Sequence, residues 1–142
     1  MTLPTPHTGP LGLAWLMFSP IGRVSREPFC LGLALAWCLF AIPMSIWIQD
    51  LALTSETDME TAMSQLVGEH PSLPLMLLAF QWVEIALVIK RLQDKALTGF
   101  LAVLLFVPFI NIVLLLGLCV MPGDSGANVY GPHPNSRWKR PG

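Results

Sequence analysis

The stretch ALVIKRLQDKALTGFLAVLLF, residues 86–106, places four charged side chains within six positions between two long apolar segments. The whole chain is equally uneven, because 54% of its 142 residues are hydrophobic and only 12% are charged. A soluble domain typically carries about 25% charged residues. A surface this poor in charge does not suit a protein that faces water on every side. We therefore expect an integral membrane protein, and the charge pattern does not indicate a nucleic-acid partner.

Two apolar runs flank an acidic loop and are candidates for membrane spans. Residues 28–49 contain no charged side chain. At about 1.5 Å per residue they can cross a hydrocarbon core of roughly 30 Å. Residues 73–89 are shorter and are interrupted by Gln81 and Glu84, which places them at the lower limit for a span.

The third apolar run, residues 98–121, allows two interpretations. It is long enough to span, but Pro108 and Asn111 lie near its middle. Membrane helices tolerate proline where neighbouring groups satisfy the freed carbonyl, so we prefer a kinked third span. The alternative is a re-entrant hairpin that turns at Pro108.

The basic residues predict the orientation, since Lys and Arg gather on the cytoplasmic side of spans. Arg23 and Arg26 precede the first run, and three further basic residues lie in the predicted inner loop, residues 90–97. The predicted outer loop, residues 50–72, holds five acidic residues and no Lys or Arg. This pattern predicts a cytoplasmic N-terminus. The tail, residues 122–142, is also basic, and three full spans would place it outside, which favours the hairpin.

The remaining segments are short or turn-rich. Residues 1–17 begin with a Pro- and Gly-containing stretch, and we expect a flexible or interfacial N-terminal segment. In the outer loop, Ser55 followed by Asp58 is typical of a capping box and predicts a short amphipathic helix. The tail is rich in Gly, Pro and Asn, which predicts turns.

One face of the second run carries polar side chains. Four positions at helical spacing share this face: Gln81, Glu84, Val88 and Arg91. A carboxylate in mid-membrane is costly, so it normally faces the protein interior or a cavity. Glu84 either forms an ion or proton site with Gln81 and Asn111, or it pairs with an arginine and holds the helices together. We prefer the second interpretation.

The sequence offers little for catalysis. The three cysteines form no CxxC pair and no spacing with histidine that is typical of zinc. The segment GDSGA, residues 123–127, is similar to a serine-protease signature, but it lies in a turn-rich tail without the scaffold that a catalytic triad needs. We therefore expect no catalytic residue, metal or cofactor.

Three separated pieces carry a family resemblance. They are FSPIGRVSREPF (residues 18–29), KRLQDKALTGF (residues 90–100) and PGDSGANVYGPHP (residues 122–134). In this order around the apolar runs they resemble the domain of unknown function 805 family, the YhaH-like small bacterial inner-membrane proteins. The chain departs from that pattern at Lys90, where the family has Arg, and at Gln93, where it has His.

The resemblance implies an inner-membrane location and no established activity. It also implies a cluster at the cytoplasmic ends of the helices, which would either hold the helices together or bind anionic headgroups. The members of this predicted cluster are Arg23, Arg26, Arg91, Asp94, Asn128 and Tyr130.

We therefore predict an all-α integral membrane protein, a small helical bundle of three membrane-embedded segments. The predicted role is that of a non-enzymatic scaffold that interacts with anionic lipids, a membrane-protein partner or further copies of itself. The alternative is a small oligomeric ion or solute transporter or channel subunit that uses Glu84 and Asn111.

Overall fold

The structure, a computed structural model, describes residues 12–54 and 58–138, and all of its regular elements there are helices. The tail has an isolated β-bridge between Asn128 and Gly131 but forms no β-strand in the described residues. The predicted all-α class is confirmed. The elements in order are α1 (Leu13–Phe18), α2 (Arg26–Thr54), α3 (Met59–Glu69), α4 (Leu73–Asp94), the 3₁₀-helix η1 (Gly99–Phe106) and α5 (Ile110–Val120).

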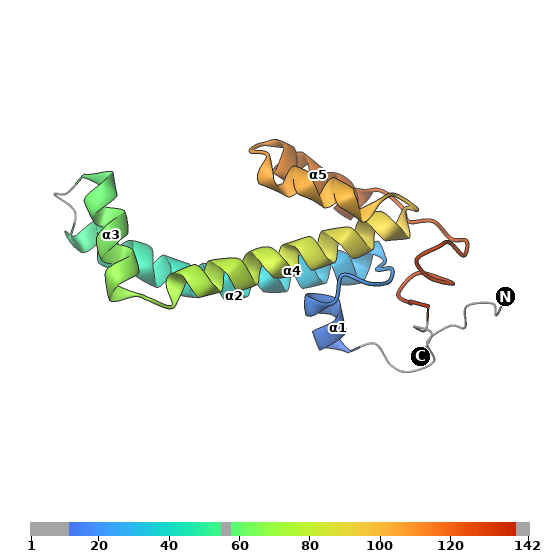
Figure 1. Ribbon diagram of the computed structural model, residues 1–142, viewed down its shortest axis with the longest axis horizontal. Helices are drawn as coiled ribbons and strands as arrows, with labels where there is room; N and C mark the ends of the chain where they lie inside the picture. The colour runs from blue at the N-terminus through green and yellow to red at the C-terminus, as the bar shows by residue number, and fades with distance from the viewer. Residues whose placement is uncertain (1–11, 55–57, 139–142) are drawn as a thin grey trace.

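The long helices α2 and α4 lie side by side and form the body of the molecule (Figure 1). Both are long and apolar enough to cross a membrane. Only 17% of the apolar stretch of α2 and 39% of that of α4 are buried inside the protein. The core helices of a soluble domain are mostly buried, so the apolar outer faces of this pair favour a lipid environment.

Helix α4 is longer than the sequence indicated. It continues through the basic segment to Asp94, so the first part of the predicted inner loop is helical. Lys90, Arg91 and Asp94 are buried as part of this last helical stretch. The chain then turns through Ala96, which has a φ of +55°, and enters η1.

The third apolar run is not one kinked helix, which corrects our preferred interpretation. It divides into η1 and α5, joined at residues 107–109. Val107 is extended, as expected for a residue before proline. Phe109 has a φ of +66°, and Ile110 N–H donates to Pro108 O at 2.8 Å, which closes a γ-turn and reverses the chain.

Contacts at the base of this hairpin show that α5 ends beside α4, where η1 begins. Arg91 Nε donates to Leu118 O near the end of α5 at 2.9 Å. Lys95 Nζ donates to Pro122 O, just beyond α5, at 2.8 Å. In Figure 1 the hairpin leaves α4 near its C-terminus and its turn stops short of the end that carries α3. The tail that follows α5 thus lies at the same end as the start of α2.

The main hydrophobic core lies at this same end of the molecule. It joins the segment before α2 to α4, η1 and α5, and its buried members are Val24, Phe29, Leu87, Val88, Leu92, Ala102, Leu105 and Leu118. The opposite end has a small cluster around Trp47 and Leu73. There α3 contacts α2. The predicted capping residue Ser55 lies outside the described residues.

Candidate functional site

The end of α4 holds a buried ion cluster, which we call the joint and define by Arg23, Arg91 and Asp94. Arg23 Nε donates to Asp94 Oδ1 at 3.2 Å, and Arg91 Nη1 donates to Asp94 Oδ2 at 2.6 Å. Arg91 and Asp94 are one turn apart on α4, whereas Arg23 comes from the segment that leads into α2. No side chain of the joint is more than 1% exposed. Because one carboxylate faces two guanidinium groups, positive charge is left over.

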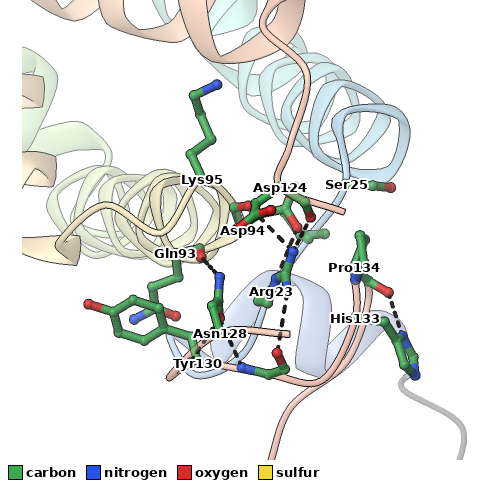
Figure 2. Close-up of polar contacts among 12 residues, drawn as sticks. Arg23, Ser25, Gln93, Asp94, Lys95, Asp124, Asn128, Tyr130, His133 and Pro134 are labelled. Atoms are coloured by element: carbon green, nitrogen blue, oxygen red, sulfur yellow. Dashed lines mark hydrogen bonds and ion pairs between the residues drawn. The ribbon is translucent and has the colours of Figure 1, made fainter. Parts of the chain in front are cut away.

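Backbone carbonyls of the tail accept the remaining donors of Arg23. Its guanidinium donates to Asp124 O, to Gly126 O and, at 3.2 Å, to Gly131 O. Figure 2 shows Arg23 between Asp94 on α4 and the loop that begins at Asp124. One side chain therefore fastens the tail to two helices.

Arg91 fastens the end of α5 to α4 in a similar way. Its guanidinium donates to Leu118 O, to Met121 O and, at 3.4 Å, to Val24 O. The last carbonyls of a helix have no partner within the helix and carry partial negative charge, which suits a buried cation. The joint thus binds the start of α2, the end of α4, the end of α5 and the tail.

Gly123 explains why the tail can approach so closely. A Cβ at this position would overlap Asp94 Oδ2 and lie 3.1 Å from Arg91 Nη1. The next residue, Asp124, donates its N–H to Asp94 O at 2.8 Å. The tail therefore crosses the end of α4 with no room for a side chain at Gly123.

Lys90 forms a second buried anchor, which we did not predict. Its Nζ donates to Trp15 O at 2.8 Å, to Leu16 O at 2.5 Å and to Ser19 O at 2.6 Å. The ammonium group also lies 4.8 Å from the centre of the Trp15 ring. Among the described residues no carboxylate pairs with Lys90, so the C-terminal carbonyls of α1 are its counter-charge.

The tail is folded by its own polar side chains. Asn128 Oδ1 accepts N–H groups from Tyr130 at 2.9 Å and Gly131 at 3.2 Å, an Asx-type turn. Asn128 Nδ2 donates to Gln93 O at 2.9 Å, so the turn rests on α4 (Figure 2). Trp138 Nε1 donates to Asn128 O at 3.0 Å from the other side.

The structure brings most of the predicted cluster together but leaves Arg26 out. Arg23, Arg91 and Asp94 are in contact, and Asn128 packs beside them through Gln93. Tyr130 is half-buried in the tail turn. Arg26 is exposed on the first turn of α2 and, among the described residues, forms no hydrogen bond or ion pair with the joint.

The predicted polar site on α4 is not assembled with Asn111. Glu84 is buried, and its Oε1 has no hydrogen-bond partner among the described residues. Gln81 is half-buried on the same face. Asn111 Oδ1 accepts the N–H of Ile112 at 2.7 Å, at the turn of the hairpin. Among residues 12–54 and 58–138, no hydrogen bond joins Glu84 to Asn111.

An apolar groove of about 480 Å³ runs between α1, α2 and α4, and carbon atoms form almost all of its wall. Within the described residues the acidic, His and Cys side chains form no group of three that could hold a metal ion. Cys30, Cys38 and Cys119 are free thiols.

The fold and the joint define a class of helical protein with two membrane-length helices and a shorter apolar hairpin. The chain belongs to the family described as protein of unknown function, DUF805, whose model matches residues 17–132. The resemblance inferred from the three sequence pieces is thereby confirmed.

Two curated relatives are similar to part of the chain. The inner membrane protein YhaI of Escherichia coli strain K12 is 45% identical over 60 residues, which are 42% of this chain and 51% of that protein. The protein of the same name from Escherichia coli O157:H7 matches to the same extent. The chain thus spans about half the length of the curated relatives it matches. No solved structure matches it.

Proposed function

We propose that this chain is a non-enzymatic inner-membrane scaffold with two full spans, α2 and α4, and a hairpin that enters the membrane from the cytoplasmic side. At about 1.5 Å per residue, the 29 residues of α2 and the 22 of α4 exceed the roughly 30 Å of a hydrocarbon core. Their exposed apolar faces and the inner-membrane relative support this topology.

The charges support a cytoplasmic position for the joint. Arg23, Lys90, Arg91 and Lys95 lie at the joint end, and the tail with Arg137 folds against it. The acidic helix α3 lies at the opposite end. Lys and Arg are retained on the cytoplasmic side, so both the N-terminus and the tail belong there.

The observation that carries the scaffold proposal is how the buried cations are used. Arg23, Arg91 and Lys90 direct their donors to Asp94 and to backbone carbonyls, and all three are sealed from solvent. Such a site holds chain segments in a fixed arrangement. The partner-binding surface would then be the rigid cytoplasmic face above the joint.

Anionic headgroups are the ligands that this face suits. The sealed cations of the joint are out of reach, which leaves the more accessible Arg26, Lys95 and Arg137. Each basic residue near an anionic surface contributes about 1 kcal/mol. Three such residues would be enough to select anionic lipid without a formed pocket.

A pair of reporter fusions tests the topology. A reporter that is active only in the cytoplasm, fused after Gly142, should be active, and the same reporter inserted after Gly68 in α3 should be silent. The reverse result at Gly142 would contradict the hairpin, because it requires a third full crossing.

Lipid retention tests the headgroup role. Purified protein should retain phosphatidylglycerol in native mass spectra, and the triple variant Arg26→Gln, Lys95→Gln, Arg137→Gln should lose it. The matched control Glu60→Gln, Glu69→Gln changes charge at the opposite end and should retain the lipid. Equal retention by both variants would contradict the proposal.

A second candidate function rests on Glu84, whose buried Oε1 lacks a partner. Intramembrane carboxylates commonly mark ion or proton paths, so a small transporter or channel subunit is the alternative. Proteoliposomes should then show an ion or proton flux that Glu84→Gln abolishes. The absence of flux in the unmodified protein would exclude this alternative.

A further inference from the structure

Each arm of the hairpin has about half the length needed to cross the hydrocarbon core. Eight residues of η1 at about 2.0 Å and eleven of α5 at about 1.5 Å each give roughly 16 Å, against a hydrocarbon core of roughly 30 Å. The first arm begins and the second arm ends beside the joint, and the turn between them stops short of the α3 end (Figure 1). With the joint at the cytoplasmic surface, the hairpin therefore occupies only the cytoplasmic leaflet.

The outer surface of the hairpin is strongly apolar. Phe109 at the turn is 82% exposed, and Phe100, Val113 and Val120 are each more than 70% exposed. The surface exposes no charged side chain between Thr98 and Met121. Acyl chains are the environment that such a surface fits, since water would leave a large apolar patch uncovered.

Helix α1 adds to the same leaflet. It crosses the α2–α4 pair transversely in Figure 1, on a different side from the hairpin. Leu13 and Phe18 are 60% and 58% exposed. Lys90 and the Trp82 indole, which donates to Phe18 O at 3.1 Å, fix α1 to α4. Short helices lying at the membrane interface insert apolar side chains among the lipids and respond to curvature.

The other leaflet holds much less protein. Beyond the turn of the hairpin, the described part of the chain continues only as α2 and α4, with α3 at their far end (Figure 1). In the described part of the chain, α1, η1 and α5 thus add to α2 and α4 at the joint end, whereas nearer α3 the cross-section contains only α2 and α4. Resting on the topology proposed above, this difference makes the molecule a wedge.

We propose that this wedge is a curvature-selective membrane device, which gathers where the cytoplasmic leaflet is convex and stabilises that shape. The hairpin and α1 displace lipids of one leaflet without an equal displacement in the other. That leaflet expands relative to its partner, and the strain is relieved where the bilayer bends away from the expanded side. The ligand of the apolar surface is accordingly the lipid of the cytoplasmic leaflet.

Membrane tubes provide the test. The full chain, with a fluorescent protein after Gly142, is reconstituted into giant vesicles of phosphatidylethanolamine and phosphatidylglycerol, and a tube is pulled from each vesicle. A membrane-impermeant quencher identifies molecules whose tail faces outward. These should be severalfold enriched in narrow tubes, and inward-facing molecules should be depleted. Equal density in tube and vesicle for both orientations would overturn the proposal.

Variants separate the wedge from other causes of sorting. Apolar residues inserted on both sides of Pro108, enough to carry each arm through the second leaflet, should abolish the enrichment. The change Leu13→Ser, Phe18→Ser should reduce it. The matched control Leu75→Ser, Leu78→Ser, at positions 70% and 69% exposed on the narrow part of α4, should retain it. Sorting of the lengthened variant like the unmodified protein would overturn the wedge.

The outcomes also distinguish this inference from the proposed topology. A silent cytoplasmic reporter after Gly142 would refute the topology. An active reporter with uniform tube density would refute the wedge alone. If a second copy fills the space around the narrow end, the assembly has no net taper, and the resulting loss of enrichment also counts against the proposal.

Discussion

The two ends of the molecule are held together in different ways. At the joint end, four helical elements and the tail meet around buried cations, and each charged nitrogen of Arg23, Arg91 and Lys90 donates at least one hydrogen bond. At the α3 end, Trp47 and Leu73 form a small apolar cluster, with Met44 and Met76 packed against it. Apolar contacts between helices lose their hydrophobic driving force in lipid, whereas hydrogen bonds shielded from water persist. The difference implies that the joint end determines the fold and that the α3 end follows it.

The strongest way to break this asymmetry is to remove the carboxylate of Asp94. Asp94→Asn leaves two buried guanidinium groups without an anion, and breaking a buried pair costs about 3–5 kcal/mol. We expect a large drop in the melting temperature of the detergent-solubilised protein and in its abundance in membranes. Glu60→Gln, an exposed change at the α3 end, is the control and should melt normally. Normal melting of Asp94→Asn would show that the joint is dispensable.

A substitution at Gly123 tests the tail contact separately from the charges. A Cβ there would overlap Asp94 Oδ2, so Gly123→Ala must push the tail away. Overpacking of this kind costs about 1–3 kcal/mol. Limited proteolysis should cut the tail of this variant faster. At Gly126 the nearest atom to a Cβ is at 3.6 Å, so Gly126→Ala is the matched control. Equal cleavage of the two variants would mean that the tail does not pack on α4.

The Lys90 anchor can be tested by Lys90→Met, which keeps the length of the side chain and removes its donors. Three carbonyls at the end of α1 lose the bond from Lys90, and in the described part of the chain only Trp15 O keeps a backbone donor there, the N–H of Ser19. An unsatisfied buried polar group costs about 1–3 kcal/mol. We expect faster hydrogen exchange in residues 13–19 and little change in the rest of α4. Lys95→Met, which removes one bond at a half-buried position, should leave α1 protected. If hydrogen exchange in residues 13–19 were unchanged in Lys90→Met, contacts other than those of Lys90 would hold α1 in place.

The sequence predicts the long elements well because their physics is local. Apolar runs with few or no charged residues predicted most of α2 and most of α4. The sequence did not decide between a kinked third span and a hairpin, because Pro108 is compatible with both. Tertiary contacts such as that of Arg91 with Leu118 O favour the hairpin. The sequence does not reveal which backbone carbonyl accepts such a bond, because every residue has one. The anchoring of α1 by Lys90 was not predicted for the same reason, because its acceptors are also backbone carbonyls.

The joint itself was predicted only in part, through the family resemblance. The spacing of Arg91 and Asp94 places them on one helical face, but nothing in the local pattern indicates that Arg23 meets them. Arg23 lies in the extended segment before α2, where Gly22 has a φ of +112° and aims the chain across the end of α4. Arg26 begins the helix three residues later and lies on its exposed side. A conformational difference over three residues thus separates a buried anchor from a surface charge.

The smallest expected effect follows from this contrast between Arg23 and Arg26. Arg26→Gln should change the free energy of unfolding by no more than about 0.5 kcal/mol, as is usual for an exposed side chain without a bonded partner. Arg23→Gln removes bonds to Asp94, Asp124 and Gly131, so it should destabilise the protein nearly as much as Asp94→Asn. Melting of the two single variants side by side in the same detergent measures the difference. If Arg26→Gln destabilises the protein as strongly as Arg23→Gln, Arg26 also belongs to the joint. The distinction drawn here between a buried Arg23 and a surface Arg26 would then be wrong.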